Sequence, residues 1–214
     1  NGTVDFDPGP AVYNLIGSSA VEIYISKLDL LGNFVWAKQI SGLGENFINS
    51  ITLDVNGNVY TTGRFQGSVD FDPGPGIYNL TSITWTDFFI CKLDPSGNFI
   101  WAKQFGQWAV DCGNYLDLDN NGNIYLNGNF EGTADFDPGA SIFNMTSSGI
   151  SDIFVSKLDA SGNFVWARQI TVNAFNYVFD IAVDENGNVL STGDFLGTAD
   201  FDPGPAVYNL STNG

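Results

Sequence analysis

The sequence predicts an all-β protein, built as a tandem array of blade-like antiparallel sheets. A 65-residue internal repeat runs through the chain, and repeats of this length indicate stacked supersecondary units. Short segments rich in Val, Ile, Phe and Tyr alternate with Asp, Asn and Gly, which is typical of strands and turns. No stretch shows a sustained helical spacing of apolar residues.

The repeat is set by the motif Asp-Phe-Asp-Pro-Gly, which begins at Asp5, Asp70, Asp135 and Asp200. This spacing divides the chain into the end of a preceding repeat, three full repeats and the start of a fourth. Their limits are residues 1–4, 5–69, 70–134, 135–199 and 200–214. Because both ends cut a repeat, we expect the chain to be a window from a longer array.

Each repeat contains two predicted β-hairpins with the same loop chemistry. In the first repeat, residues 23–28 and 34–40 flank loop 29–33, and residues 49–53 and 59–63 flank loop 54–58. Each loop starts with Asp, which can accept hydrogen bonds from the turn, and contains Gly, which can adopt the left-handed conformation. A further extended segment, residues 11–15, follows the acidic motif.

Large apolar side chains are expected on both faces of each sheet. Pairing the first hairpin about Leu31 places two sets of residues on opposite faces: Glu22, Tyr24, Ser26, Phe34, Trp36 and Lys38 on one, and Ile23, Ile25, Val35 and Ala37 on the other. A sheet that is apolar on both faces is covered on both sides. We therefore expect blades of β-propeller type, either as part of a propeller or in an open, fibrous array.

Composition excludes several classes of function. The chain has 24 acidic and 7 basic residues, a net charge of −17 and no His. Nucleic-acid binding depends on clustered cations, and Ser-His-Asp or His-ligated metal sites need His. No apolar run approaches the ~18 residues of a membrane span. A carboxylate pair copied in every repeat offers no unique active site, so we expect no enzyme.

The acidic motif is a candidate calcium site. Residues i and i+2 of an extended segment project to the same side, so its two carboxylates would lie together and present oxygen ligands. The candidate ligands are Asp5, Asp7, Asp70, Asp72, Asp135, Asp137, Asp200 and Asp202. Alternatively, the motif is a β-turn capped by Asp, whose first Asp pairs with a lysine.

The cations occupy fixed repeat positions. Six of the seven fall on two positions: Lys27, Lys92 and Lys157 on one, and Lys38, Lys103 and Arg168 on the other. We expect them to neutralise carboxylates or backbone carbonyls within or between blades; the alternative is solvated lysines at sheet edges.

Tryptophans are of two kinds. Trp36, Trp101 and Trp166 share one repeat position, which favours packing between blades. Trp85 and Trp108 break the repeat and are candidates for stacking on sugar rings.

Cysteines and asparagines suggest modifications of a secreted protein. Cys91 and Cys112 occur together in one repeat and either form a disulfide or remain two buried thiols. Asn79, Asn144 and Asn209 each begin an Asn-X-Ser/Thr sequon and are candidates for N-glycosylation, or for asparagines that satisfy a backbone group.

The segment from Lys27 to Gln39, together with residues 54–63, resembles the bacterial SBBP repeat, the seven-bladed β-propeller repeat of secreted and surface proteins. The resemblance covers about two thirds of each repeat and implies propeller blades and a secreted or cell-surface location. It implies no catalytic residues, since that family shares none. The long insertion containing Asp-Phe-Asp-Pro-Gly departs from its pattern.

Together these observations predict an extracellular structural or adhesive repeat protein, fibre- or stalk-forming and stabilised by calcium. Neighbouring repeats would associate with one another, and glycans or other cell-surface ligands would be further partners. The alternative is a carbohydrate-binding, lectin-like β-propeller, in which Trp85 and Trp108 contact the sugar.

Overall fold

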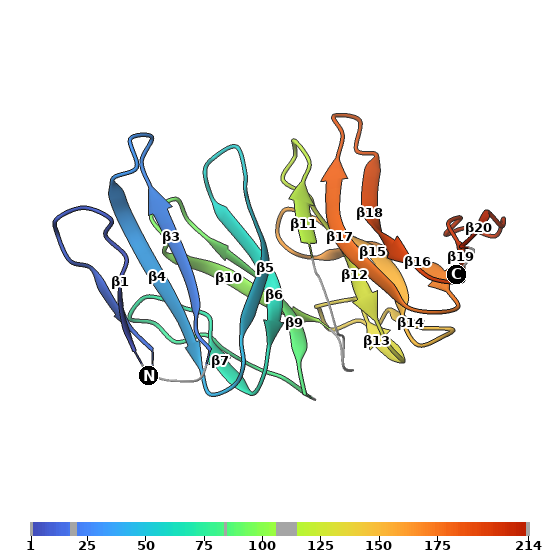
Figure 1. Ribbon diagram of the computed structural model, residues 1–214, viewed down its shortest axis with the longest axis horizontal. Helices are drawn as coiled ribbons and strands as arrows, with labels where there is room; N and C mark the ends of the chain where they lie inside the picture. The colour runs from blue at the N-terminus through green and yellow to red at the C-terminus, as the bar shows by residue number, and fades with distance from the viewer. Residues whose placement is uncertain (1, 18–20, 84, 106–114, 213–214) are drawn as a thin grey trace.

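The computed structural model describes residues 2–17, 21–83, 85–105 and 115–212, and every regular element in this part is a β-strand (Figure 1). All paired strands within its sheets are antiparallel. The sheets stand side by side in chain order along the longest axis, with the two ends of the chain at opposite ends of the molecule (Figure 1). The predicted all-β array of blades is confirmed.

Two four-stranded blades form the centre of the molecule. The first full blade has the spatial order β5-β6-β9-β10, and the second has the order β11-β12-β15-β16. Their strands are β5 Phe47–Leu53, β6 Val59–Phe65, β9 Asp87–Leu93 and β10 Phe99–Phe105, then β11 Tyr115–Leu118, β12 Ile124–Phe130, β15 Asp152–Leu158 and β16 Phe164–Val172.

A half-blade flanks each end of this central pair. The N-terminal half-blade corresponds to the last two strands of a full blade, and the C-terminal half-blade corresponds to the first two. Their strands are β3 Ile23–Leu28 with β4 Phe34–Gly42, and β17 Asn176–Val183 with β18 Val189–Phe195.

The acidic motif lies in a short hairpin, here called the insert hairpin, between the second and third strands of each blade. The four insert hairpins are β1 Thr3–Asp5 with β2 Asn14–Ile16, β7 Ser68–Asp70 with β8 Asn79–Thr81, β13 Thr133–Asp135 with β14 Asn144–Thr146, and β19 Thr198–Asp200 with β20 Asn209–Ser211. Strand β7 pairs with β4 of the preceding blade, and Tyr78 donates its hydroxyl hydrogen bond to the Ala102 carbonyl of its own blade. The insert hairpin thus joins neighbouring blades, a role that the repeat pattern did not predict.

The hairpin loops have the predicted construction. Asp54 Oδ1 accepts hydrogen bonds from the backbone N–H groups of Asn56 and Asn58, both at 2.9 Å. Gly57 has a φ of +80°, the left-handed conformation that glycine adopts without strain. The same arrangement recurs in the other five loops.

The predicted assignment of residues to the two faces of the first hairpin was wrong. Lys27 lies opposite Trp36, but Leu28 lies opposite Phe34, so Val35 is an extra residue in a β-bulge. One extra residue moves every later side chain of β4 to the other face. Ile25 therefore shares a face with Trp36 and Lys38, whereas Tyr24 and Ser26 share a face with Ala37.

Both faces of a full blade are buried, as predicted. Phe65 and Phe89 of the first full blade pack in one cluster with Ile23 and Ile25 of the N-terminal half-blade. On the opposite face, Tyr60 and Ile90 belong to a second cluster with Leu126 and Phe154 of the second full blade. A third, smaller cluster lies between the second full blade and the C-terminal half-blade and contains Ile153 and Val178.

Candidate functional site: loops and faces of the blades

The two aspartates of each acidic motif serve as backbone acceptors in the insert hairpin. Asp70 Oδ1 accepts hydrogen bonds from the N–H groups of Asp72 and Tyr78, at 3.1 and 2.8 Å. Asp72 Oδ1 accepts one from the N–H of Gly74 at 2.7 Å. The other three motifs repeat these bonds. The structure therefore supports the reading of the motif as an Asp-capped turn.

The two carboxylates of each motif are only part of a calcium ligand set. The ion takes 6–8 oxygen ligands, whereas each motif offers two carboxylates that already accept backbone hydrogen bonds. Over the described residues, no three His, Cys, Asp or Glu side chains gather in a group that could hold a metal ion. These bonds give the aspartates a role in the turn, and calcium binding at the motif stays a prediction.

A lysine lies between two aromatic rings on one face of each full blade. Trp101, Lys92 and Tyr60 lie opposite one another on β10, β9 and β6. Lys92 Nζ is 4.7 Å from the centroid of the Tyr60 ring and 3.8 Å from Asp54 Oδ2. In the second full blade Lys157 makes the equivalent contacts.

Burial raises the pKa of Asp54, but hydrogen bonds from Asn58 and Asn56 and the charge of Lys92 outweigh it, so this pKa lies below its ordinary value. These two lysines thus neutralise loop carboxylates, as the repeat predicted.

Trp36 and Lys27 connect neighbouring blades. Trp36 Nε1 and Lys27 Nζ both donate hydrogen bonds to the carbonyl oxygen of Pro95, at 3.1 and 3.0 Å. Pro95 lies in the β9–β10 loop of the first full blade, so both contacts cross from one blade to the next. The Trp101 ring likewise lies against the next blade, beside Gly162 in the corresponding loop of the second full blade.

Trp85, one of the two predicted sugar-stacking residues, is exposed to solvent. Its side chain is 77% exposed and lies just before β9, close in sequence to the exposed Ile83. Trp108 lies outside the described residues.

The structure shows Cys91 as a free thiol that is fully buried. Burial raises its pKa far above the ordinary value, and the nearby Asp72 charge adds to the shift. Cys112 lies outside the described residues, so the described part of the chain gives the disulfide no support.

The three sequon asparagines share one structural position. Asn79, Asn144 and Asn209 each begin the second strand of an insert hairpin, and all three are exposed. They lie opposite Asp70, Asp135 and Asp200. Glycosylation at this position stays a prediction.

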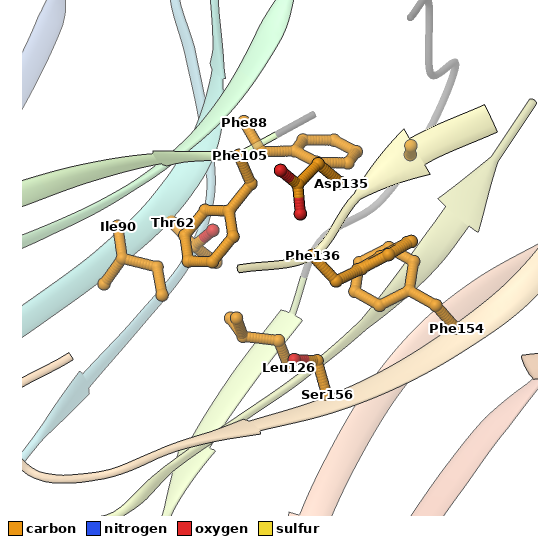
Figure 2. Close-up of a pocket in the computed structure, with 10 residues that line it drawn as sticks. Thr62, Phe88, Ile90, Phe105, Leu126, Asp135, Phe136, Phe154 and Ser156 are labelled. Atoms are coloured by element: carbon orange, nitrogen blue, oxygen red, sulfur yellow. The ribbon is translucent and has the colours of Figure 1, made fainter. Parts of the chain in front are cut away.

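A cavity between the two full blades is too small for a small-molecule ligand. Figure 2 shows its lining, which includes Phe88, Phe105, Leu126, Phe136 and Phe154. Its volume is about 20 Å³, whereas ligand pockets measure ~300–1,000 Å³. This space belongs to the packing between blades.

Sequence reasoning missed a set of buried amides that joins the second full blade to the C-terminal half-blade. Asn127 Nδ2 donates to the Asp180 carbonyl and to Ser191 Oγ, both at 2.8 Å. Asn129 Nδ2 donates to Asn176, and Asp117 Oδ2 accepts the N–H of Val183 at 2.8 Å. The available signal was departure from the repeat: Asn127 and Asn129 stand where the first full blade has Thr62 and Arg64.

Comparisons with known proteins agree with this architecture. A family model described as the SBBP beta-propeller repeat matches residues 35–64, which run from β4 through the β5–β6 hairpin. The chain is also similar to an uncharacterized WD repeat-containing protein of Acanthamoeba polyphaga mimivirus, with 28% identity over 216 residues. That alignment covers 89% of this chain and 15% of the viral protein's length. The fold is therefore an all-β array of β-propeller-type repeats.

Within the described residues, the structure has no helix with the length and apolarity needed to cross a membrane.

Proposed function

We propose that this chain is a structural repeat module that acts outside the cell, where its stacked blades hold a fixed shape and associate with further blades. One observation carries the proposal: the charged and aromatic residues best suited to bind a ligand recur in every repeat, and there they hold the blades together. Asp54 caps a loop, Lys92 neutralises that aspartate, and Trp36 contacts the next blade.

The extracellular part of the proposal rests on the resemblance to the SBBP repeat of secreted and surface proteins; a model of that repeat matches residues 35–64. A membrane-impermeant, amine-reactive biotin reagent, applied to intact cells that make the protein, should label the exposed Lys27. A cytoplasmic protein of the same cells serves as the control and should stay unlabelled. Labelling that occurs only after lysis would refute an extracellular location.

Carbohydrate binding is the second candidate, and the exposure of Trp85 favours it. An exposed indole, two residues from the exposed Ile83, offers a flat surface on which a sugar ring can stack. A glycan array should then give reproducible signals that Trp85→Ala abolishes. Ile77→Ala, a change at another exposed apolar residue, is the matched control and should keep them. An array without reproducible signals removes this candidate.

A further inference from the structure

Three of the six hairpin loops contain an asparagine followed by glycine. These Asn-Gly loops join the first strand of a blade to the second: β5 to β6, β11 to β12, and β17 to β18. Their pairs are Asn56-Gly57, Asn121-Gly122 and Asn186-Gly187. The other three loops, which join β3 to β4, β9 to β10 and β15 to β16, have Leu31, Ser96 or Ser161 before the glycine. The Asn-Gly pair thus belongs to one class of loop.

An asparagine before glycine can react with its own backbone. The glycine nitrogen bonds to Cγ of the asparagine and loses its proton to solvent, while the bond from Cγ to the side-chain nitrogen breaks and ammonia leaves. Water then opens the resulting succinimide ring at either of its two C–N bonds. One opening gives aspartate, and the other gives isoaspartate, whose backbone passes through the former side chain. The reaction consumes water alone, and glycine favours it because no Cβ crowds its nitrogen.

The first asparagine of each Asn-Gly loop has an unrestrained side chain. Asn56, Asn121 and Asn186 are exposed, and among the described residues their side-chain amides make no hydrogen bond. The second asparagine is held, because Asn58 Nδ2 donates to Asp54 Oδ2 at 2.7 Å, and the two other loops repeat this bond. A β-branched residue follows the second asparagine in all three loops. The structure therefore favours reaction at the first asparagine.

The loop aspartate controls access of the glycine nitrogen to the amide. The Gly57 N–H donates to the Asp54 carbonyl oxygen at 2.9 Å, and the Asn56 N–H donates to Asp54 Oδ1 at 2.9 Å. Both bonds hold the dipeptide in the turn. The nitrogen can attack only after the loop opens, so the reaction rate should follow the fraction of time that the loop is open.

A buried Asn-Gly pair in a strand provides the comparison. Asn127 and Gly128 lie in β12, and Asn127 is 0% exposed. Asn127 Nδ2 donates to the Asp180 carbonyl and to Ser191 Oγ, and Gly128 pairs with Phe154 of β15. The sheet holds this dipeptide extended and keeps water away from it. The same two residues should therefore react in the loops and stay intact in the strand.

We propose that Asn56, Asn121 and Asn186 are sites of spontaneous deamidation, through which the folded chain slowly and irreversibly converts its own loops to aspartate and isoaspartate. The local environment selects these sites, since the buried pair has the same composition. This modification goes beyond the structural role of the blades and does not depend on where the protein is located.

The products should loosen the Asn-Gly loops. Isoaspartate lengthens the backbone between Asp54 and Asn58, whose side chains are joined at 2.7 Å, so this bond must lengthen or break. Asp54 also lies 3.8 Å from Lys92, and its displacement weakens that ion pair. Either product adds a carboxylate. Full conversion of the three sites adds three negative charges to a chain whose net charge is already −17.

Peptide mapping by mass spectrometry tests the sites on the full 214-residue chain, incubated folded at neutral and at alkaline pH. Asn56, Asn121 and Asn186 should gain the mass of an amide-to-acid conversion, faster at alkaline pH because the attacking nitrogen loses a proton. Asn127 should stay unchanged. A sample digested at time zero corrects for conversion during handling, and a chain incubated in urea shows that Asn127 reacts once it is unfolded.

Removal of one cap tests control by the loop aspartate. Asp54→Ala should speed conversion of Asn56 at least ~3-fold, because the opened loop is more populated. Asn121 and Asn186 of the same chain should keep their parent rates. Asp29→Ala, at a loop without the Asn-Gly pair, is the matched control and should change none of the three sites. An intact Asn127 shows that the variant is still folded.

A variant without the reactive amides tests the consequence for stability. The triple variant Asn56→Ser, Asn121→Ser and Asn186→Ser carries the residue that Ser96 and Ser161 place in the other loops. The melting temperature of the parent should fall with incubation time, in step with isoaspartate content. The melting temperature of the triple variant should not change over the same period.

The outcomes separate the parts of the proposal. Loops that stay unconverted over a time in which the urea-unfolded chain reacts, or equal conversion of Asn127 and the loops in folded protein, overturn it. An unchanged Asn56 rate in folded Asp54→Ala overturns control by the cap. Conversion without a fall in melting temperature overturns the loosening of the loops and supports the sites themselves.

Discussion

At the scale of single residues, the loop aspartates hold the hairpin loops through hydrogen bonds, and two of them also pair with a lysine. Asp119 accepts backbone hydrogen bonds from Asn121 and Asn123 and a side-chain bond from Asn123, and it lies 3.7 Å from Lys157. Asp159, in the next loop of the same blade, makes the equivalent loop bonds and has no ion pair of this length in the described structure. The two positions therefore separate the loop bonds from the added contacts of Asp119 with Lys157 and with the Tyr125 hydroxyl.

We expect Asp119→Ala to lower the free energy of unfolding by about 2–4 kcal/mol, because it removes several charge-assisted bonds and leaves Lys157 without its carboxylate. Asp159→Ala should cost about 1–2 kcal/mol, mainly through the loop bonds, with a small part from the more distant charge of Lys103. Urea unfolding followed by tryptophan fluorescence measures both. Equal losses would show that the contacts of Asp119 with Lys157 and Tyr125 add nothing.

Stability should fall in acid because six loop aspartates have lowered pKa values. Hydrogen bonds from the loop asparagine hold the pKa of Asp29 and Asp184 below its ordinary value, as they do for Asp94 and Asp159. At Asp54 and Asp119 burial raises the pKa, but hydrogen bonds and a lysine charge outweigh it, so the pKa is lowered there too. A pKa lowered in the folded state gives stability above the unfolded pKa, and this stability is lost as pH falls through the folded pKa. Asp87 has the opposite effect on the pH dependence of stability, because burial raises its pKa.

Urea midpoints measured between pH 6 and pH 2.5 should therefore decline below pH ~4. Asp119→Asn should show a shallower decline, since it carries one fewer of these carboxylates. A midpoint that rises steadily into acid would show that relief of repulsion at a net charge of −17 dominates instead.

Removal of calcium should leave the melting temperature unchanged, because the motif aspartates bind backbone N–H groups. The double variant Asp70→Asn with Asp72→Asn should melt lower than the parent by the same amount in calcium and in chelator. Differential scanning calorimetry measures both. A fall in the parent's melting temperature on chelation, absent from the double variant, would establish a calcium site.

At the scale of elements, the sequence predicted the strands and loops because their signals are local. Asp, Gly and Asn at fixed positions define each loop, and apolar runs define the strands beside it. The faces of the first hairpin could not be predicted, because the bulge at Val35 carries no residue signature of its own. The pairing of β7 with β4 was also beyond local reasoning, because it joins segments of different repeats.

Gly63 is required by a close approach of two strands. A Cβ at this position would lie 1.9 Å from the carbonyl oxygen of Phe47, beside the bulge at Asn49. Gly63→Ala should therefore lower the free energy of unfolding by more than ~2 kcal/mol, as backbone clashes do. Gly2→Ala meets no atom within 4 Å and is the matched control. Equal urea midpoints for the two variants would contradict this account.

At the scale of the whole molecule, the structure is a row in which each blade packs against its neighbours. Cations at fixed repeat positions were predicted to make contacts within or between blades. Lys92 pairs with Asp54 within its own blade, and Lys27 donates to Pro95 of the next blade. The particular partners could not be read from the sequence, because Pro95 lies 68 residues from Lys27 and belongs to another blade. Asn127 and Asn129 depart from the repeat, but that departure does not reveal the partners of their amides, which lie on β17 and β18.

Local stability should differ along this row of blades. Central strands β6, β9, β12 and β15 pair on both sides and lie in buried clusters, whereas β3 and β18 pair on one side and are largely exposed. Hydrogen exchange measured in dilute, monomeric protein should be slowest in the central four and fastest at the outward amides of β3 and β18. Protection that is uniform from β3 to β18 would instead show that the blades open as one cooperative unit, and that the two unpaired edges cost the row no local stability.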